Sequence, residues 1–111
     1  MFNKLMKLIL KKEGRKGKIN LILTNDREIR KLNRIYRHKD KATDVLAFPM
    51  NEEGIIGDIA ISRDTAQRNA NKFGVKLRDE LKRLTVHGVL HLLGYKHGRV
   101  MRNGEKIYQQ F

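Results

Sequence analysis

Three of the 4 histidines of this 111-residue chain lie in one short segment, His87-Gly88-Val89-Leu90-His91-Leu92-Leu93-Gly94-Tyr95-Lys96-His97. His87 and His91 are four positions apart, so on a helix their rings project from one face and can converge on one cation. Gly94 can take the left-handed backbone conformation that ends a helix and turns the chain back, which would bring His97 to the same cation. The segment therefore predicts a metal site with three histidine ligands.

Three neutral imidazoles without a fourth protein ligand are typical of an open, catalytic metal site, and this ligand set suits zinc. The chain has no cysteine, so thiolate ligands and disulfides are excluded. The same histidine spacing occurs in metalloproteases of the motif H-E-x-x-H-x-x-G-x-x-H. Gly88 stands where those enzymes carry their glutamate general base, which disfavours peptide hydrolysis by that mechanism.

The charge of the chain points to a polyanionic partner. Lys and Arg number 25 against 12 Asp and Glu, a net charge of +13, and the basic residues are spread along the chain. A domain with this excess attracts nucleic acid, and its binding weakens with salt as phosphates are neutralised. No apolar stretch approaches the roughly 18 residues of a membrane span. We therefore expect a cytoplasmic protein that binds nucleic acid and no membrane.

The hydrophobic pattern predicts one domain over residues 1–111, of the α+β class. We expect one small mixed β-sheet packed with several α-helices, with the three-histidine site at the end of a central helix. Asn25 is expected to cap a helix that buries Ile29, Leu32, Ile35 and Tyr36. The remaining expected elements are helices at 2–12, at 63–73 between Ser62 and Gly74, at 78–93 and at 101–111 with an interruption at Gly104, and strands at 19–23, at 45–48 ending at Pro49, and at 55–61.

The histidine segment resembles the signature H-G-x-L-H-L-x-G-Y-D-H of the YbeY family of endoribonucleases and rRNA maturation factors. Further matches to that family are Leu32-Asn33, Tyr36-Arg37, Asp40, Thr43-Asp44-Val45-Leu46 and Gly57-Asp58-Ile59. The resemblance implies a metal-dependent hydrolase of RNA phosphodiesters, associated with ribosome assembly. It also implies one zinc ion per chain held by His87, His91 and His97, with Arg37 as the catalytic arginine and rRNA or ribosomal particles as partners.

One departure from the family pattern leaves two functions open. Lys96 stands where the family has Asp. Losing a carboxylate that supports a metal ligand lowers metal affinity or activity by about 10–100-fold. The alternative role of Lys96 is to bind a phosphate of the substrate. The first function is a zinc-dependent endoribonuclease specific for single-stranded RNA, in which the planar guanidinium of Arg37 stabilises charge on the phosphorus centre. The alternative is a non-catalytic RNA-binding ribosome-assembly factor with a structural metal.

Four other polar residues carry weaker expectations. We expect His38 to be an exposed loop histidine, although its place beside Arg37 would also let it contact RNA. Glu80 is two helical turns before His87, so we expect it to act through helix-start electrostatics rather than in catalysis. For Asp44 and Asp58, hydrogen bonding near the site and ordinary turn or sheet-edge chemistry remain open alternatives.

Overall fold

The computed structural model describes residues 1–96 and 98–111 and confirms the α+β class. Within this described part, no helix combines the length and the apolar character needed to cross a membrane. The elements follow one another as α1 (Asn3–Lys12), β1 (Lys18–Thr24), α2 (Asp26–Arg37), β2 (Val45–Glu52), β3 (Ile55–Ser62), α3 (Arg63–Phe73), α4 (Leu77–Leu92) and α5 (Arg99–Tyr108).

The sheet is mixed, as predicted, with the strand order β1-β3-β2. β2 and β3 form an antiparallel hairpin, whereas β1 pairs in parallel with β3 after the chain has passed through α2. The central position of β3 explains its continuous apolar sequence, because a strand with neighbours on both edges and helices on both faces is almost fully buried.

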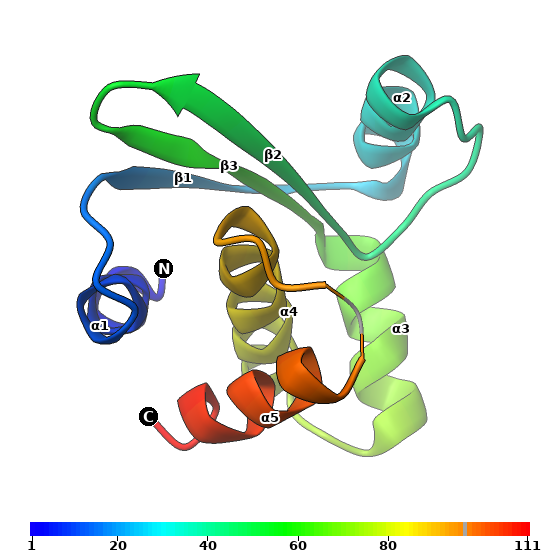
Figure 1. Ribbon diagram of the computed structural model, residues 1–111. Helices are drawn as coiled ribbons and strands as arrows, with labels where there is room; N and C mark the ends of the chain where they lie inside the picture. Colours follow the sequence, from blue (N-terminus) through cyan, green and yellow to red (C-terminus); the bar gives the residue numbers. More distant parts are fainter. Residues whose placement is uncertain (97) are drawn as a thin grey trace.

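Helices cover both faces of the sheet. Figure 1 shows α2 on one face and α1, α4 and α5 on the other. Successive β3 side chains point to opposite faces, so Ile59 and Ile61 enter the main core against α4, while Ala60 packs with Ile29 and Leu46 under α2. The main core is therefore on the α4 side, and α2 is held over a much smaller apolar cluster.

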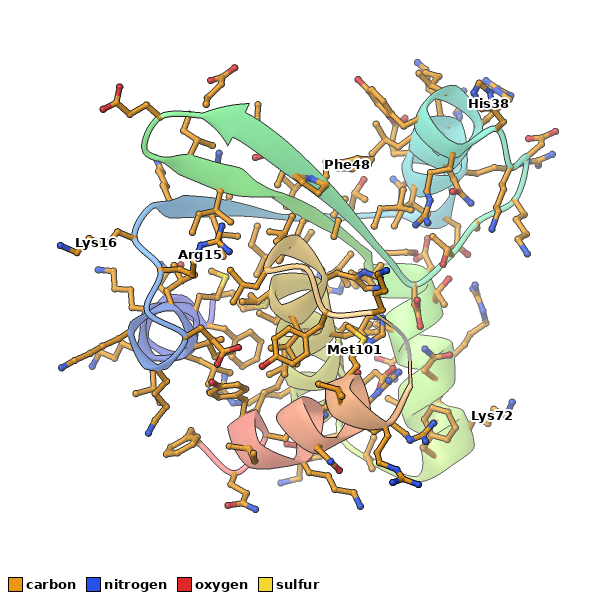
Figure 2. All side chains as sticks on the ribbon, viewed as in Figure 1. Arg15, Lys16, His38, Phe48, Lys72 and Met101 are labelled. Atoms are coloured by element: carbon orange, nitrogen blue, oxygen red, sulfur yellow. The ribbon has the colours of Figure 1, made fainter. Side chains whose placement is uncertain are left out.

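α4 is the central helix, and a glycine brings it close to the sheet. A Cβ placed on Gly88 would lie 2.9 Å from Cγ2 of Ile59 on β3, nearer than side-chain carbons approach one another. Met101 packs between α5 and α4 and is 1% exposed (Figure 2). The residue that follows His87 is thus a glycine for a packing reason, whatever chemistry the site performs.

The helix-capping predictions are confirmed. Oδ1 of Asn25 accepts a hydrogen bond from the Glu28 amide at 2.9 Å, and Oγ of Ser62 accepts one from the Thr65 amide at 3.3 Å. Gly74 ends α3 with φ of 67°, a conformation that favours glycine. Local sequence therefore sets the boundaries of α2 and α3.

Three details of the prediction are wrong. Ile35 and Tyr36 are 54% and 64% exposed, because the apolar cluster under α2 is small; the Tyr36 ring lies beside Phe48, at 5.2 Å between ring centroids. β2 continues through Pro49, which an edge strand tolerates. α5 runs through Gly104, whose missing side chain lets α5 lie against Leu90 of α4.

Candidate active site

The end of α2, the start of β2 with the loop before it, and the last turns of α4 surround a hollow of about 190 Å³, which we call the α2–α4 hollow. It brings together four residues singled out in the sequence, Arg37, Asp44, His87 and His91. Its complete lining is Arg37, Thr43, Asp44, Val45, Ala47, His87, Gly88 and His91. A guanidinium, a carboxylate and two imidazoles from three separate elements thus share one small volume.

The two histidines lie one helical turn apart on α4, as their spacing predicts. Their ring centroids are 5.0 Å apart and their planes meet at 66°. Nδ1 of His87 lies 2.7 Å from Oε1 of Glu105, and both side chains are mostly buried. A carboxylate on one ring nitrogen fixes the orientation of an imidazole and makes the ring a better metal ligand.

Glu105 is a site residue that the sequence reasoning missed. It belongs to α5, a separate helix that no histidine pattern marks. The available signal was the neighbouring Gly104, because a glycine inside a helix often marks a close approach of another element. Here the close approach of α5 to α4 is what allows Glu105 to reach His87.

The donor set fits a metal ion such as zinc, for which imidazole is a preferred ligand. Among residues 1–96 and 98–111, no group of three histidine or acidic side chains is arranged to hold a metal. His97, the third predicted ligand, lies outside the described residues, so the three-histidine site stays a prediction. The turn that it requires is present, since Gly94 has φ of 94° and the Tyr95 amide donates to the Leu90 carbonyl at 3.0 Å.

Arg37 reaches the hollow because α2 ends at that residue. His38 follows in the left-handed conformation, with φ of 57°. The buried Asn33 secures this end of the helix, because its carbonyl accepts from the Lys39 amide at 3.3 Å and its Nδ2 donates to the Lys41 carbonyl at 2.9 Å. One asparagine thus fixes both the last turn of α2 and the loop behind Arg37.

The start of α2 is fixed by Asp26. Its carboxylate accepts hydrogen bonds from Oγ of Ser62 at 2.5 Å, Oγ1 of Thr65 at 2.6 Å and Nη2 of Arg68 at 2.6 Å. Partial burial by itself would raise the pKa of Asp26, but these hydrogen bonds and the Arg68 charge hold the pKa at about 2. The carboxylate is therefore ionised at neutral pH and ties α2 to the first turn of α3.

A buried polar network supports the Asp44 wall of the hollow. Glu80 is 1% exposed and accepts from Nε and Nη2 of Arg83, at 2.8 and 2.7 Å, and from Nδ2 of Asn69 at 2.9 Å. Asn69 also donates to Oδ2 of Asp44 at 3.3 Å. Glu80 stands in the first turn of α4, as expected, and because its carboxylate is also deeply buried it requires these charged and hydrogen-bonding partners.

The other predicted residues lie elsewhere. Oδ1 of Asp58 accepts from Nδ2 of Asn20 at 3.0 Å across the β1–β3 pair, so Asp58 serves the sheet. Lys96 is exposed and lines a separate hollow with residues of the 93–100 segment. His38 is exposed as expected, on the outside of the molecule at the end of α2 (Figure 2).

Comparison with known proteins gives consistent matches. The family model described as Endoribonuclease YbeY matches residues 1–109. A protein named Endoribonuclease YbeY from Aquifex aeolicus is 55% identical over 83 residues, which are 71% of this chain and 55% of that protein. The protein of the same name from Carboxydothermus hydrogenoformans is 42% identical over 107 residues, 89% of this chain and 75% of that protein.

The fold has a solved counterpart. The solution structure of TM1509 from Thermotoga maritima superposes with a TM-score of 0.73 at 34% sequence identity, covering 98% of this chain and 77% of that chain. The match to the Aquifex aeolicus protein and a 49% identical match to the Koribacter versatilis protein cover 55% and 59% of those proteins. The chain thus spans little more than half the length of these two relatives.

Proposed function

Because the chain belongs to the YbeY endoribonuclease family, we propose that it is a zinc-dependent endoribonuclease that cleaves single-stranded RNA. One observation carries the proposal: Arg37 and the two α4 histidines line one hollow although they come from separate elements. The net charge of +13 suits a phosphate-rich substrate. The biological setting that we propose is rRNA maturation and ribosome assembly in the cytoplasm.

His87, His91 and His97 are the proposed ligands of one zinc ion per chain. Zinc, when bound, supplies a Lewis acid that polarises a phosphoryl oxygen and activates water. The Glu105 carboxylate holds the His87 ring in place by its contact with Nδ1 of His87. Because Gly88 has no side chain, α4 packs closely against Ile59 of the sheet. The two histidines of α4 are therefore carried on a firmly packed helix.

Arg37 has the role of stabilising charge. Cleavage of a phosphodiester builds negative charge on the oxygens around phosphorus, and a guanidinium offers two parallel N–H donors and a charge that does not titrate. Asn33 and His38 end α2 at Arg37, so the guanidinium is presented at the rim of the hollow without a long flexible loop. Asp44 and Thr43 add polar walls to which water and a ribose hydroxyl can hydrogen-bond.

The test uses zinc analysis and cleavage of a labelled single-stranded RNA by the purified chain. Wild type should contain about one zinc and cleave; His91→Ala should lose both. Arg37→Ala should keep zinc and thermal stability but lower kcat by about 10²–10³-fold. Lys39→Ala, an exposed neighbouring cation outside the hollow, serves as the control and should match wild type. Unchanged cleavage in both His91→Ala and Arg37→Ala would refute the proposal.

The second candidate is a non-catalytic RNA-binding ribosome-assembly factor with a structural metal. The observation that favours it is Lys96, which stands where the family motif has an acidic residue. This function requires that His91→Ala lowers the melting temperature while Arg37→Ala leaves RNA binding and ribosome maturation intact. Loss of RNA cleavage in Arg37→Ala at wild-type stability would exclude it.

A further inference from the structure

The solvent face of α2 carries a continuous row of cations. Arg27, Arg30, Lys31 and Arg34 are spaced i, i+3, i+4 and i+7, so they share one face of the helix, and all four are exposed. We call these four residues the α2 basic stripe. The buried residue Ile29 lies on the opposite side of α2, toward the sheet, so the stripe occupies the side of α2 that the described residues leave exposed to solvent.

A shallow hollow of about 860 Å³ runs along this stripe. Lys41 adds a fifth cation to its lining, and Asp26, Glu28 and Asp40 add three carboxylates. Asp26 is held by Ser62, Thr65 and Arg68. Asp40 is bound by Arg30, at 2.9 and 3.3 Å, with Arg34 at 3.8 Å. In the described part of the chain Arg27, Lys31 and Lys41 make no ion pair, so the hollow keeps a positive excess.

The stripe leads to the α2–α4 hollow. Arg37 follows Arg34 by one helical turn, at the edge of the same face, and lines the hollow with His87 and His91. From Arg27 to Arg37 the helix rises about 15 Å. The cations of α2 therefore form a path along the helix that ends at the candidate catalytic group.

We propose that the α2 basic stripe is the track along which the RNA strand is bound before it enters the α2–α4 hollow. The inference rests on the proposed function and adds the surface that holds the substrate. Spaced cations on one helix face match the regular negative charges of a phosphodiester backbone, and contacts to phosphate do not depend on base sequence. The small volume of the α2–α4 hollow suits one phosphodiester group of a single strand better than a duplex.

The experiment compares two triple variants that remove the same charge. The first is Arg27→Gln, Lys31→Gln and Arg34→Gln; it keeps Arg30, so the ion pair with Asp40 survives. The control is Lys4→Gln, Lys7→Gln and Lys11→Gln on the exposed face of α1. α1 and α2 lie on opposite sides of the molecule in Figure 1. Glutamine keeps helix propensity in both variants.

Binding is measured by fluorescence anisotropy of a labelled single-stranded RNA of roughly 12 nucleotides, a length within the range of known single-strand sites. The chelator EDTA is present to prevent cleavage, and salt is varied. The α2 triple should bind about tenfold or more weakly, and its slope of log K against log salt should fall by about 2, since each lost phosphate contact contributes about 0.7. The α1 triple should stay within about twofold of wild type. In cleavage assays the α2 triple should raise KM and leave kcat unchanged.

Two outcomes would overturn the inference. An equal loss of RNA affinity in the α1 and α2 triple variants would mean that only the total charge matters. Unchanged RNA affinity in the α2 triple variant would mean that this face does not bind RNA and would leave an acidic protein as its partner. Because RNA binding is measured without metal, the binding result tests the track independently of whether the chain cleaves RNA. Wild type that does not cleave RNA, with binding lost selectively in the α2 triple, would refute the nuclease and support the track.

Discussion

At the scale of single residues, the α2–α4 hollow depends on side chains that do not line it. Glu105 lies 2.7 Å from His87, and Asn33 secures the helix end that carries Arg37. Glu80, Asn69 and Arg83 together hold Asp44. Each of these supporting groups is buried or partly buried, so its polar atoms are committed to the contact that they make. These contacts thus fix the His87 ring, the Asp44 carboxylate and the backbone that carries Arg37.

The Glu105 contact gives a residue-scale prediction. Glu105→Gln keeps the shape of the side chain but removes the charge that supports His87, so zinc affinity should fall by about 10–100-fold. Competition with a chromogenic chelator measures the affinity directly. The control is Glu53→Gln, an exposed carboxylate in the turn between β2 and β3. Equal zinc affinity in wild type and Glu105→Gln would show that the contact does not support the metal.

At the scale of elements, α4 serves as both the core helix and the site helix. Its inner face packs on β3 through Gly88 and the buried Leu92, while His87 and His91 face the hollow. A change in the distance between α4 and β3 therefore displaces the histidines as well as the core. α2 differs, since it is held by a small apolar cluster and by polar contacts at its two ends.

Gly88→Ala tests this coupling of core and site. The added Cβ would lie 2.9 Å from Cγ2 and 3.0 Å from Cδ1 of Ile59, so the free energy of unfolding should fall by about 1–3 kcal/mol. Zinc affinity should fall as well. In an Ile59→Ala background the Gly88→Ala change should cost much less, and urea denaturation of the four chains of this double-mutant cycle measures the difference. A cost that is the same in both backgrounds would locate the clash elsewhere.

The sequence predicted the elements well because their signals are local. Asn25 and Ser62 cap helices with their own side chains, and Gly74 ends one with its own backbone. Exposure of Ile35 and Tyr36 was not predictable in the same way, because it depends on how little of the sheet α2 covers.

The site was predictable only where a motif marks it. The histidine spacing on α4 and the resemblance around Arg37 identified residues that the fold then brings into one hollow. Glu105 of α5 contacts His87 of α4, and Glu80 of α4 contacts Asn69 of α3. Both contacts depend on how α5 and α3 pack against α4. Sequence spacing within one element carries no information about such contacts.

At the scale of the whole molecule, one carboxylate joins the first helix to the last. Glu13, at the end of α1, accepts hydrogen bonds from Oη of Tyr95 at 2.5 Å and from Oη of Tyr108 at 3.0 Å. Two effects raise the pKa of Tyr108 to about 12: burial, which is the larger, and the hydrogen bond to Glu13. The hydrogen bond to Glu13 also raises the pKa of Tyr95. The hydrogen bonds that join the end of α1 to Tyr95 and to α5 therefore require both tyrosines to be protonated.

This arrangement predicts an alkaline loss of stability. The folded chain keeps the Tyr108 proton up to about pH 12, whereas an unfolded tyrosine releases it near about pH 10. The stabilisation is complete below about pH 10 and is lost as the pH rises toward 12, by about 1–2 kcal/mol. Denaturant unfolding at pH 9 and pH 11.5 should show this loss, and Tyr108→Phe should reduce it. Identical pH dependence in wild type and Tyr108→Phe would refute the assignment.

The strand order also determines how the chain is assembled. β2 and β3 are joined by a two-residue turn at Glu53 and Gly54, so their pairing closes a very short loop. β1 pairs with β3 only after a loop containing α2 and β2 has closed, since Ile19 lies opposite Gly57. Contacts between distant segments form slowly because the chain entropy of closing the loop is lost before the contact is gained. We therefore expect the β2–β3 hairpin, which supplies one wall of the α2–α4 hollow, to form early and the α1–β1 segment, which supplies none of that wall, to dock late.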